Sequence, residues 1–121
     1  FDDKGVWGLD TEIPCLLPHP NTYCAFPRYI ETYGEHRIED SIRKITGFPA
    51  EWLGITDRGV IREGACADIV ILDTESLKTN EDYVETRNYP DGIPYVIVNG
   101  KLVVDKYTHT GERAGKVLRK K

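Results

Sequence analysis

The chain has 121 residues, of which 40% are hydrophobic and 30% are charged, and its formal net charge at pH 7 is −4. This length allows one domain with a modest core. The only basic cluster lies at the C-terminus, which argues against the concentrated basic face that nucleic-acid binding requires. No apolar run approaches the roughly 20 residues of a membrane span. We therefore expect neither nucleic acid nor a membrane as a partner.

Cysteine usage indicates the compartment in which the chain works. Cys15, Cys24 and Cys66 are odd in number and widely spaced, which is not typical of a disulfide framework. A reducing compartment keeps such thiols free. We therefore expect a cytoplasmic protein.

The first residues predict a loop followed by a helix. Residues 1–17 show no sustained hydrophobic period, and a Pro-His-Pro turn follows at 18–20. Proline favours the first position of a helix and glycine favours its end. We therefore expect a helix that opens at Pro27 and ends at Gly34.

Two further helices are expected before residue 55. Ile38, Ile42 and Ile45 recur at the spacing of one helix face, and Gly47 is expected to close that helix. Pro49 and Gly54 then bracket a short third helix, again with proline at its first position and glycine at its end.

Strands replace helices near residue 55. The apolar run at 69–72 predicts a buried strand that is entered through a glycine-marked turn. The polar stretch at 74–92 predicts a loop with room for a helical turn at 80–84. Asn99-Gly100 lies between two apolar runs rich in β-branched residues, at 95–98 and 101–104, which is typical of a hairpin closed by a type I′ turn.

A two-residue loop fixes the pairing of the hairpin strands. The expected pairs are Val98–Lys101, Ile97–Leu102, Val96–Val103 and Tyr95–Val104. Both faces of this ribbon are apolar, and exposing four such side chains would forfeit about 6–12 kcal/mol. That loss matches the whole stability of a typical domain, about 5–15 kcal/mol. We therefore expect the ribbon to belong to a larger packed body.

Two segments resemble the C-terminal end of the metal-dependent amidohydrolases. Residues 57–73 read DRGVIREGACADIVILD, and residues 95–104 read YVIVNGKLVV. They are similar to the G-x-I-x-x-G-x-x-A-D-I-V segment and the V-x-V-N-G hairpin that build a small β-sandwich beside a (β/α)₈ barrel in that superfamily. The resemblance implies an α/β fold in which residues 1–54 close the barrel domain and residues 55–121 form the C-terminal part of the sandwich.

Two flanking segments resemble one branch of the superfamily, the N-acyl-D-amino-acid deacylases, or D-aminoacylases. Residues 18–28 read PHPNTYCAFPR and residues 109–119 read HTGERAGKVLR. The branch carries H-P-R-x-Y-G-T-F-P-R and T-G-x-R-x-G-x-V-L-R. The likeness covers essentially the whole chain but only about the last quarter of such an enzyme. Because the chain also begins at Phe1 and contains no methionine, we expect a piece or a processed form of a longer protein.

The resemblance implies that Asp3 is a metal ligand and a catalytic residue. In the resembled enzymes an aspartate at the end of the last barrel strand binds the metal and handles the proton of the attacking water. Asp3 lies 16 residues before His19, which is a fitting interval. A carboxylate suits both tasks because it can bind zinc and accept a proton. Here D-D-K-G replaces the usual S-D-G, so Asp2 stays open as an alternative.

The resemblance also implies that His19 and Asn21 lie at the substrate. Asn21 stands where the family has an arginine, whose guanidinium suits a substrate carboxylate. Asparagine keeps the donors and loses the charge. His19 can instead be a turn histidine that bonds the backbone. A metal site of Cys15, His19 and Cys24 is disfavoured because it lacks paired C-x₂-C ligands.

The expected function is that of the C-terminal part of a zinc-dependent amidohydrolase that hydrolyses N-acyl-D-amino acids to a carboxylate and a D-amino acid. The implied cofactor is zinc, and the partners are this small-molecule substrate and the rest of the enzyme. A lone aspartate cannot hold a catalytic zinc, which needs about three protein ligands, so the isolated chain is expected to be inactive. Two alternatives stay open: another amidohydrolase (dihydroorotase-, hydantoinase- or dipeptidase-like), or a non-catalytic β-sandwich module that pairs with another chain.

Overall fold

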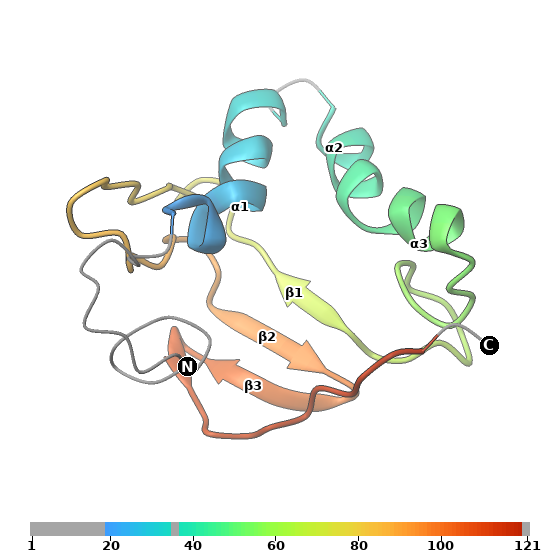
Figure 1. The fold of residues 1–121 in the computed structure, drawn as a ribbon. Helices are drawn as coiled ribbons and strands as arrows, with labels where there is room; N and C mark the ends of the chain where they lie inside the picture. The colour runs from blue at the N-terminus through green and yellow to red at the C-terminus, as the bar shows by residue number, and fades with distance from the viewer. Residues whose placement is uncertain (1–18, 35–36, 120–121) are drawn as a thin grey trace.

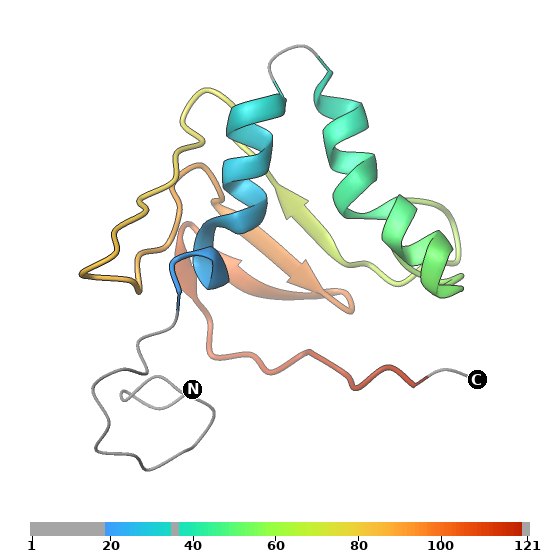
Figure 2. The ribbon, with the colours of Figure 1, turned by 45° about the horizontal axis from the view of Figure 1, so that its top comes forward.

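The computed structural model describes residues 19–34 and 37–119 of the chain. Three helices lie on one side of a sheet, and the C-terminal tail runs along the other side (Figures 1 and 2). The elements in chain order are α1 (Asn21–Tyr33), α2 (Ile38–Ile45), α3 (Gly47–Leu53), β1 (Ile69–Ile71), β2 (Tyr95–Val98), β3 (Lys101–Asp105) and β4 (Thr108–His109). The loop expected over residues 1–17, which includes Asp3, lies outside the described residues.

Helix α1 begins at Asn21, so the prediction that Pro27 opens it was wrong. Pro20 already has helical angles, with φ −50° and ψ −31°, and its carbonyl accepts the Cys24 amide at 3.2 Å. Proline restricts φ to a helical value, which favours a helix start at Pro20. Pro27 then lies inside the helix, where it lacks an amide proton to donate to the preceding turn. Cys24 and Ile30 are buried on this helix and offset that loss.

Helix α2 has its predicted core, but Gly47 does not close it. Thr46 interrupts the helix with φ −128° and ψ −82°, and its hydroxyl donates to the Ile42 carbonyl at 2.7 Å. Gly47 instead begins α3, two residues before the predicted start at Pro49. The predicted end is confirmed, because Gly54 takes a left-handed conformation with φ 71°.

The strands form a four-stranded antiparallel sheet in the order β1-β2-β3-β4. The predicted hairpin is confirmed, since Asn99 and Gly100 both have positive φ, at 49° and 79°. The predicted strand at 69–72 is confirmed over three residues as β1, but it is not buried within this chain. Every strand pair in the described part of the chain is antiparallel, so the parallel strands of a barrel are not among these residues.

The predicted pairing of the hairpin is right near the turn and wrong beyond it. Val98 pairs with Lys101 and Ile97 with Leu102, as expected. A bulge between Val96 and Ile97 then shifts the register, and the pairs that follow are Val96–Val104 and Tyr95–Asp105. A bulge sets two residues of one strand against one of its partner and breaks the alternation of faces. Val104 therefore joins Val96 on one face instead of Tyr95 on the other.

This chain leaves its sheet largely uncovered. In the described residues, no helix is in close backbone contact with a strand. Val70 and Ile71 are neighbours on β1, so their side chains point to opposite faces. They are 52% and 47% exposed, so neither face is sealed at β1. The open faces are what we expect of a sheet that belongs to a larger packed body.

The described helices are all short. None of them is long and apolar enough to cross a membrane. The longest, α1, has 13 residues.

Candidate functional site

Two of the residues that the motifs single out lie together at the start of α1. The Asn21 amide donates to His19 Nδ1 at 3.2 Å, and both side chains are exposed. A neutral imidazole that accepts at Nδ1 carries its proton at Nε2. In the described part of the chain, nothing bonds His19 Nε2 or the Asn21 side-chain amide. The His19 Nε2–H and the Asn21 side-chain amide are therefore hydrogen-bond donors open to their surroundings.

An extended segment of the loop between β1 and β2 runs along α1, and we call residues 79–83 the clamp. Its alternate residues contact α1 and the turn before it. Thr79 donates to Glu31 from its backbone amide at 3.2 Å and from its hydroxyl at 2.8 Å. The other two contacts are an ion pair between Glu81 and Arg28 and an edge-on ring contact between Tyr83 and His19 at 5.6 Å.

The clamp runs antiparallel to α1, because its successive contacts move from Glu31 near the end of the helix to His19 before its start. Every second side chain of an extended chain points the same way. The intervening Asn80 points elsewhere and donates to the Tyr89 carbonyl at 3.0 Å and to Asp91 Oδ2 at 3.2 Å. The clamp is therefore held from both sides.

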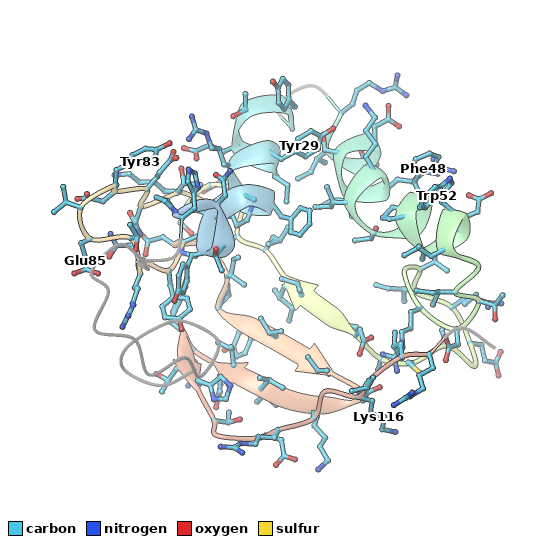
Figure 3. All side chains as sticks on the ribbon, in the orientation of Figure 1. Tyr29, Phe48, Trp52, Tyr83, Glu85 and Lys116 are labelled. Carbon is cyan, nitrogen blue, oxygen red and sulfur yellow. The ribbon has the colours of Figure 1, made fainter. Side chains whose placement is uncertain are left out.

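The clamp ends in a turn on the loop beside α1, and Figure 3 shows Tyr83 and Glu85 on this loop. Asp82 Oδ1 accepts the amides of Val84 at 2.7 Å and Glu85 at 3.2 Å. Such a side-chain turn competes with helical bonding of the same amides. The loop predicted at 74–92 is confirmed, and the helical turn for which it had room at 80–84 does not form.

A second polar cluster, the clasp (Arg58, Asp68 and Asn99), joins the two segments at 57–73 and 95–104 that resemble the amidohydrolases. The Asn99 amide donates to Asp68 Oδ1 at 2.7 Å, and Arg58 Nη2 donates to Asn99 Oδ1 at 2.6 Å. Arg58 Nη1 also pairs with the Asp68 carboxylate. Asn99 Nδ2 donates to the carbonyl of Ala114 at 2.7 Å, which ties the tail to the hairpin turn. The acidic residue of the first motif and the asparagine of the second are thus bonded directly to each other.

The clasp changes the ionisation of its charged members. Burial opposes ionisation of Asp68, but the Asn99 amide and the Arg58 guanidinium outweigh it and lower the pKa of Asp68. The hydrogen bond from Arg58 to Asp68 raises the pKa of the guanidinium in turn. Both groups are therefore charged at neutral pH, and the clasp stabilises the contact between the segment before β1 and the hairpin turn.

Replacing Asp68 by asparagine should make the free energy of unfolding depend less on pH in the acid range. The pKa of Asp68 is lower in the folded chain than the unfolded value of about 3.9, so its contribution is fully present above that value. It is lost as the pH falls through the folded pKa, so wild type and Asp68→Asn should converge in strong acid. Unfolding of the complete protein by urea at several pH values measures this convergence.

An Arg58→Met background is the control for that experiment. There the Asp68→Asn change should have a smaller effect, because the ion pair is already lost. A difference between wild type and Asp68→Asn that stays constant down to strong acid would contradict the assignment.

The described residues do not form a metal site. No group of three or more histidine, cysteine or acidic side chains within 19–34 and 37–119 could hold a metal ion. The buried Cys24 thiol donates instead to the Pro20 carbonyl at 3.1 Å. Asp3 and Cys15 lie outside the described residues, so the structure places neither. The part of the chain in view therefore does not by itself fit a catalytic zinc.

The sequence pattern of the amidohydrolase family matches residues 2–104, which is most of the chain. This chain belongs to the amidohydrolase family. Within the family it is 32% identical over 105 residues to a D-aminoacylase of Alcaligenes xylosoxydans xylosoxydans and 32% identical over 105 residues to an N-acyl-D-aspartate deacylase of the same organism. These matches cover 84% of this chain but 22% and 21% of the relatives. The chain thus spans about a fifth of their length.

Solved structures of D-aminoacylase agree with the sequence comparison. They superpose with a TM-score of 0.79 at 31% identity, over 85% of this chain and 23% of the longer one. One of these structures concerns the functional role of the binuclear metal center in D-aminoacylase, and another is a D-aminoacylase mutant in complex with CuCl₂. The resemblance to the D-aminoacylase branch that the motifs indicated is confirmed.

Proposed function

We propose that this chain is the C-terminal part of a zinc-dependent amidohydrolase that hydrolyses the amide bond of N-acyl-D-amino acids. The observation that carries the proposal is the TM-score of 0.79 at 31% identity to D-aminoacylase over 85% of the chain. The curated relatives support the same substrate class, because they include deacylases of N-acyl-D-aspartate and N-acyl-D-glutamate.

In this proposal residues 1–54 close a barrel domain and residues 55–121 contribute to a small β-sandwich. Within residues 19–34 and 37–119, the helices make no close backbone contact with the sheet, which supports a boundary between two bodies. The half-exposed Val70 and Ile71 support further layers from the rest of the enzyme on the sheet. Cys24 and Cys66 are free thiols, which supports a reducing, cytoplasmic location.

Asp3 is the proposed contribution of this chain to the metal centre, as a ligand and as the acceptor of the proton from the attacking water. Zinc needs about three protein ligands, so the others must come from outside the described residues. The metal, when bound, would polarise the scissile carbonyl and activate water.

His19 and Asn21 are the proposed substrate contacts. The open Nε2–H of His19 and the neutral side-chain amide of Asn21 are donors that suit the carboxylate of an N-acyl amino acid. Neutral donors bind a carboxylate less strongly than the guanidinium of the family motif. We therefore expect weak discrimination at the carboxylate and a larger share of the binding free energy from the acyl group and side chain.

A substrate panel on the complete enzyme tests the proposal. The panel holds N-acetyl-D-amino acids, their L-enantiomers, dihydroorotate, a hydantoin and a D-containing dipeptide, and release of the product amine or acid is measured. Hydrolysis restricted to the N-acyl-D-amino acids is the expected result, and it should be lost on chelation and regained with zinc.

The same panel separates the alternatives. Turnover of the cyclic amides or the dipeptide alone would replace the proposal by another amidohydrolase. No turnover of any substrate by the zinc-loaded enzyme would favour a non-catalytic module.

A further inference from the structure

The contact between His19 and Tyr83 joins the proposed substrate loop to a distant segment of the chain. The two ring centroids are 5.6 Å apart and the planes meet at 86°, which is a favourable edge-on geometry for aromatic rings. Tyr83 is 68% exposed, so the packing of a core does not explain its position. The position of Tyr83 follows instead from the clamp, because the contacts of Thr79 and Glu81 with α1 bring the end of this segment next to His19.

The backbone of the clamp is fixed without help from the Tyr83 ring. Thr79 is bonded twice to Glu31, and Glu81 is paired with Arg28. Asp82 then caps the turn that follows through the amides of Val84 and Glu85. Removing the ring of Tyr83 therefore leaves the segment in place and changes only what the ring touches.

The imidazole of His19 has few other restraints. In the described residues its one hydrogen bond is the acceptance of the Asn21 amide at 3.2 Å, at an exposed site. That bond fixes one ring nitrogen but still lets the ring tilt about it. The edge-on contact with Tyr83 supplies a second point of contact and restricts that tilt.

We propose that Tyr83 is a positioning residue, which holds the His19 imidazole so that its Nε2–H faces the carboxylate of the bound N-acyl amino acid. This inference rests on the proposed function for the identity of the ligand. The positioning itself rests on the contacts between Tyr83, His19 and Asn21 alone. Tyr83 acts through His19 and does not touch the reacting atoms.

The test compares Tyr83→Ala and Tyr83→Phe in the complete enzyme. Loss of the ring should raise KM for N-acetyl-D-amino acids about two- to tenfold, the factor that corresponds to one aromatic pair, with kcat unchanged. Tyr83→Phe keeps the ring and should restore the wild-type KM. Tyr33→Ala is the matched control, since Tyr33 is 65% exposed at the opposite end of α1 and contacts Tyr29 instead.

A second readout does not depend on turnover. The NMR resonances of the His19 imidazole, assigned with a His19→Gln variant, should shift in Tyr83→Ala and stay unshifted in Tyr83→Phe and Tyr33→Ala. Unchanged His19 resonances in Tyr83→Ala would overturn the positioning role. An equal loss of kcat and kcat/KM without a change in KM would overturn it too.

The two proposals fail differently. If the wild-type enzyme does not hydrolyse N-acyl-D-amino acids, the proposed function falls, and the NMR comparison still decides whether Tyr83 orders His19. If the wild type is active and Tyr83→Ala has the wild-type KM, the proposed function stands and this inference falls.

Discussion

Replacing Val70 by lysine should destabilise the complete enzyme by roughly 3 kcal/mol or more, the scale of an uncompensated charge at a buried site. Val70 is 52% exposed in this chain, and at such a surface position most substitutions stay within about 0.5 kcal/mol. The large loss is expected because we propose that the rest of the enzyme covers this face of the sheet. Urea unfolding and the fraction of soluble enzyme measure the effect.

Thr74→Lys is the matched control for that change. It adds the same single charge four residues further on, at an exposed position in the turn after β1. The control should stay close to wild type. A Val70→Lys enzyme as stable as Thr74→Lys would mean that the face is open to solvent, and the larger packed body would then be the wrong explanation of the apolar ribbon.

Replacing Gly92 by alanine should cost about 2–5 kcal/mol, of which the left-handed backbone accounts for about 1–2 and the clash for about 1–3. Gly92 has φ 79°, and a Cβ there would lie 2.5 Å from Leu77 Cα and 2.8 Å from the Asp73 carbonyl oxygen. Both neighbours are backbone atoms, so relief requires the loop itself to move. The segment from Asp73 to Leu77 leads directly into the clamp at residue 79.

Gly64→Ala isolates the clash from the backbone strain. Gly64 has φ 80°, and an added Cβ there meets no atom within 4 Å. It should therefore lose only the backbone part, about 1–2 kcal/mol. Thermal and urea unfolding of the two variants of the complete enzyme measure the difference. Equal losses in both would show that the loop at Leu77 yields freely, contrary to its close packing against Gly92.

Local patterns were enough for the parts of the fold that local physics decides. The isoleucines of α2 keep the period of one helix face, and Asn99-Gly100 is one of the few dipeptides that adopts two positive φ values readily. The end of α3 follows from the left-handed preference of Gly54. In these cases the residue type itself restricts the backbone.

Other features depend on contacts between distant residues. Either Pro20 or Pro27 could precede the start of α1, and the helix begins directly after Pro20. Pro27 then lies inside the helix and lacks one backbone hydrogen bond, which the burial of Cys24 and Ile30 offsets. The bulge opposite Val96 leaves no mark in the sequence of the two runs, which are rich in β-branched residues on both strands. A pattern of hydrophobic residues cannot reveal either outcome.

The candidate site divides in the same way. His19 and Asn21 were predicted from the motif, and the hydrogen bond between them spans only two residues, within the reach of sequence reasoning. The role of Tyr83 was missed because the segment Thr-Asn-Glu-Asp-Tyr at 79–83 has no hydrophobic period. The residues that this segment contacts are also polar. A hint was present in the alternation of Thr79, Glu81 and Tyr83. Asp3 stays a prediction, because it lies outside the described residues.

Because alternate residues of the clamp face α1, the number of residues between Thr79 and Tyr83 is constrained. Adding or removing one residue between Thr79 and Tyr83 would exchange the inward and outward sets, so that Asn80 and Asp82 would confront α1 in their place. Length changes among homologous chains should therefore occur beyond Tyr83, where the turn at Asp82–Glu85 gives way to an irregular stretch, or should come in twos.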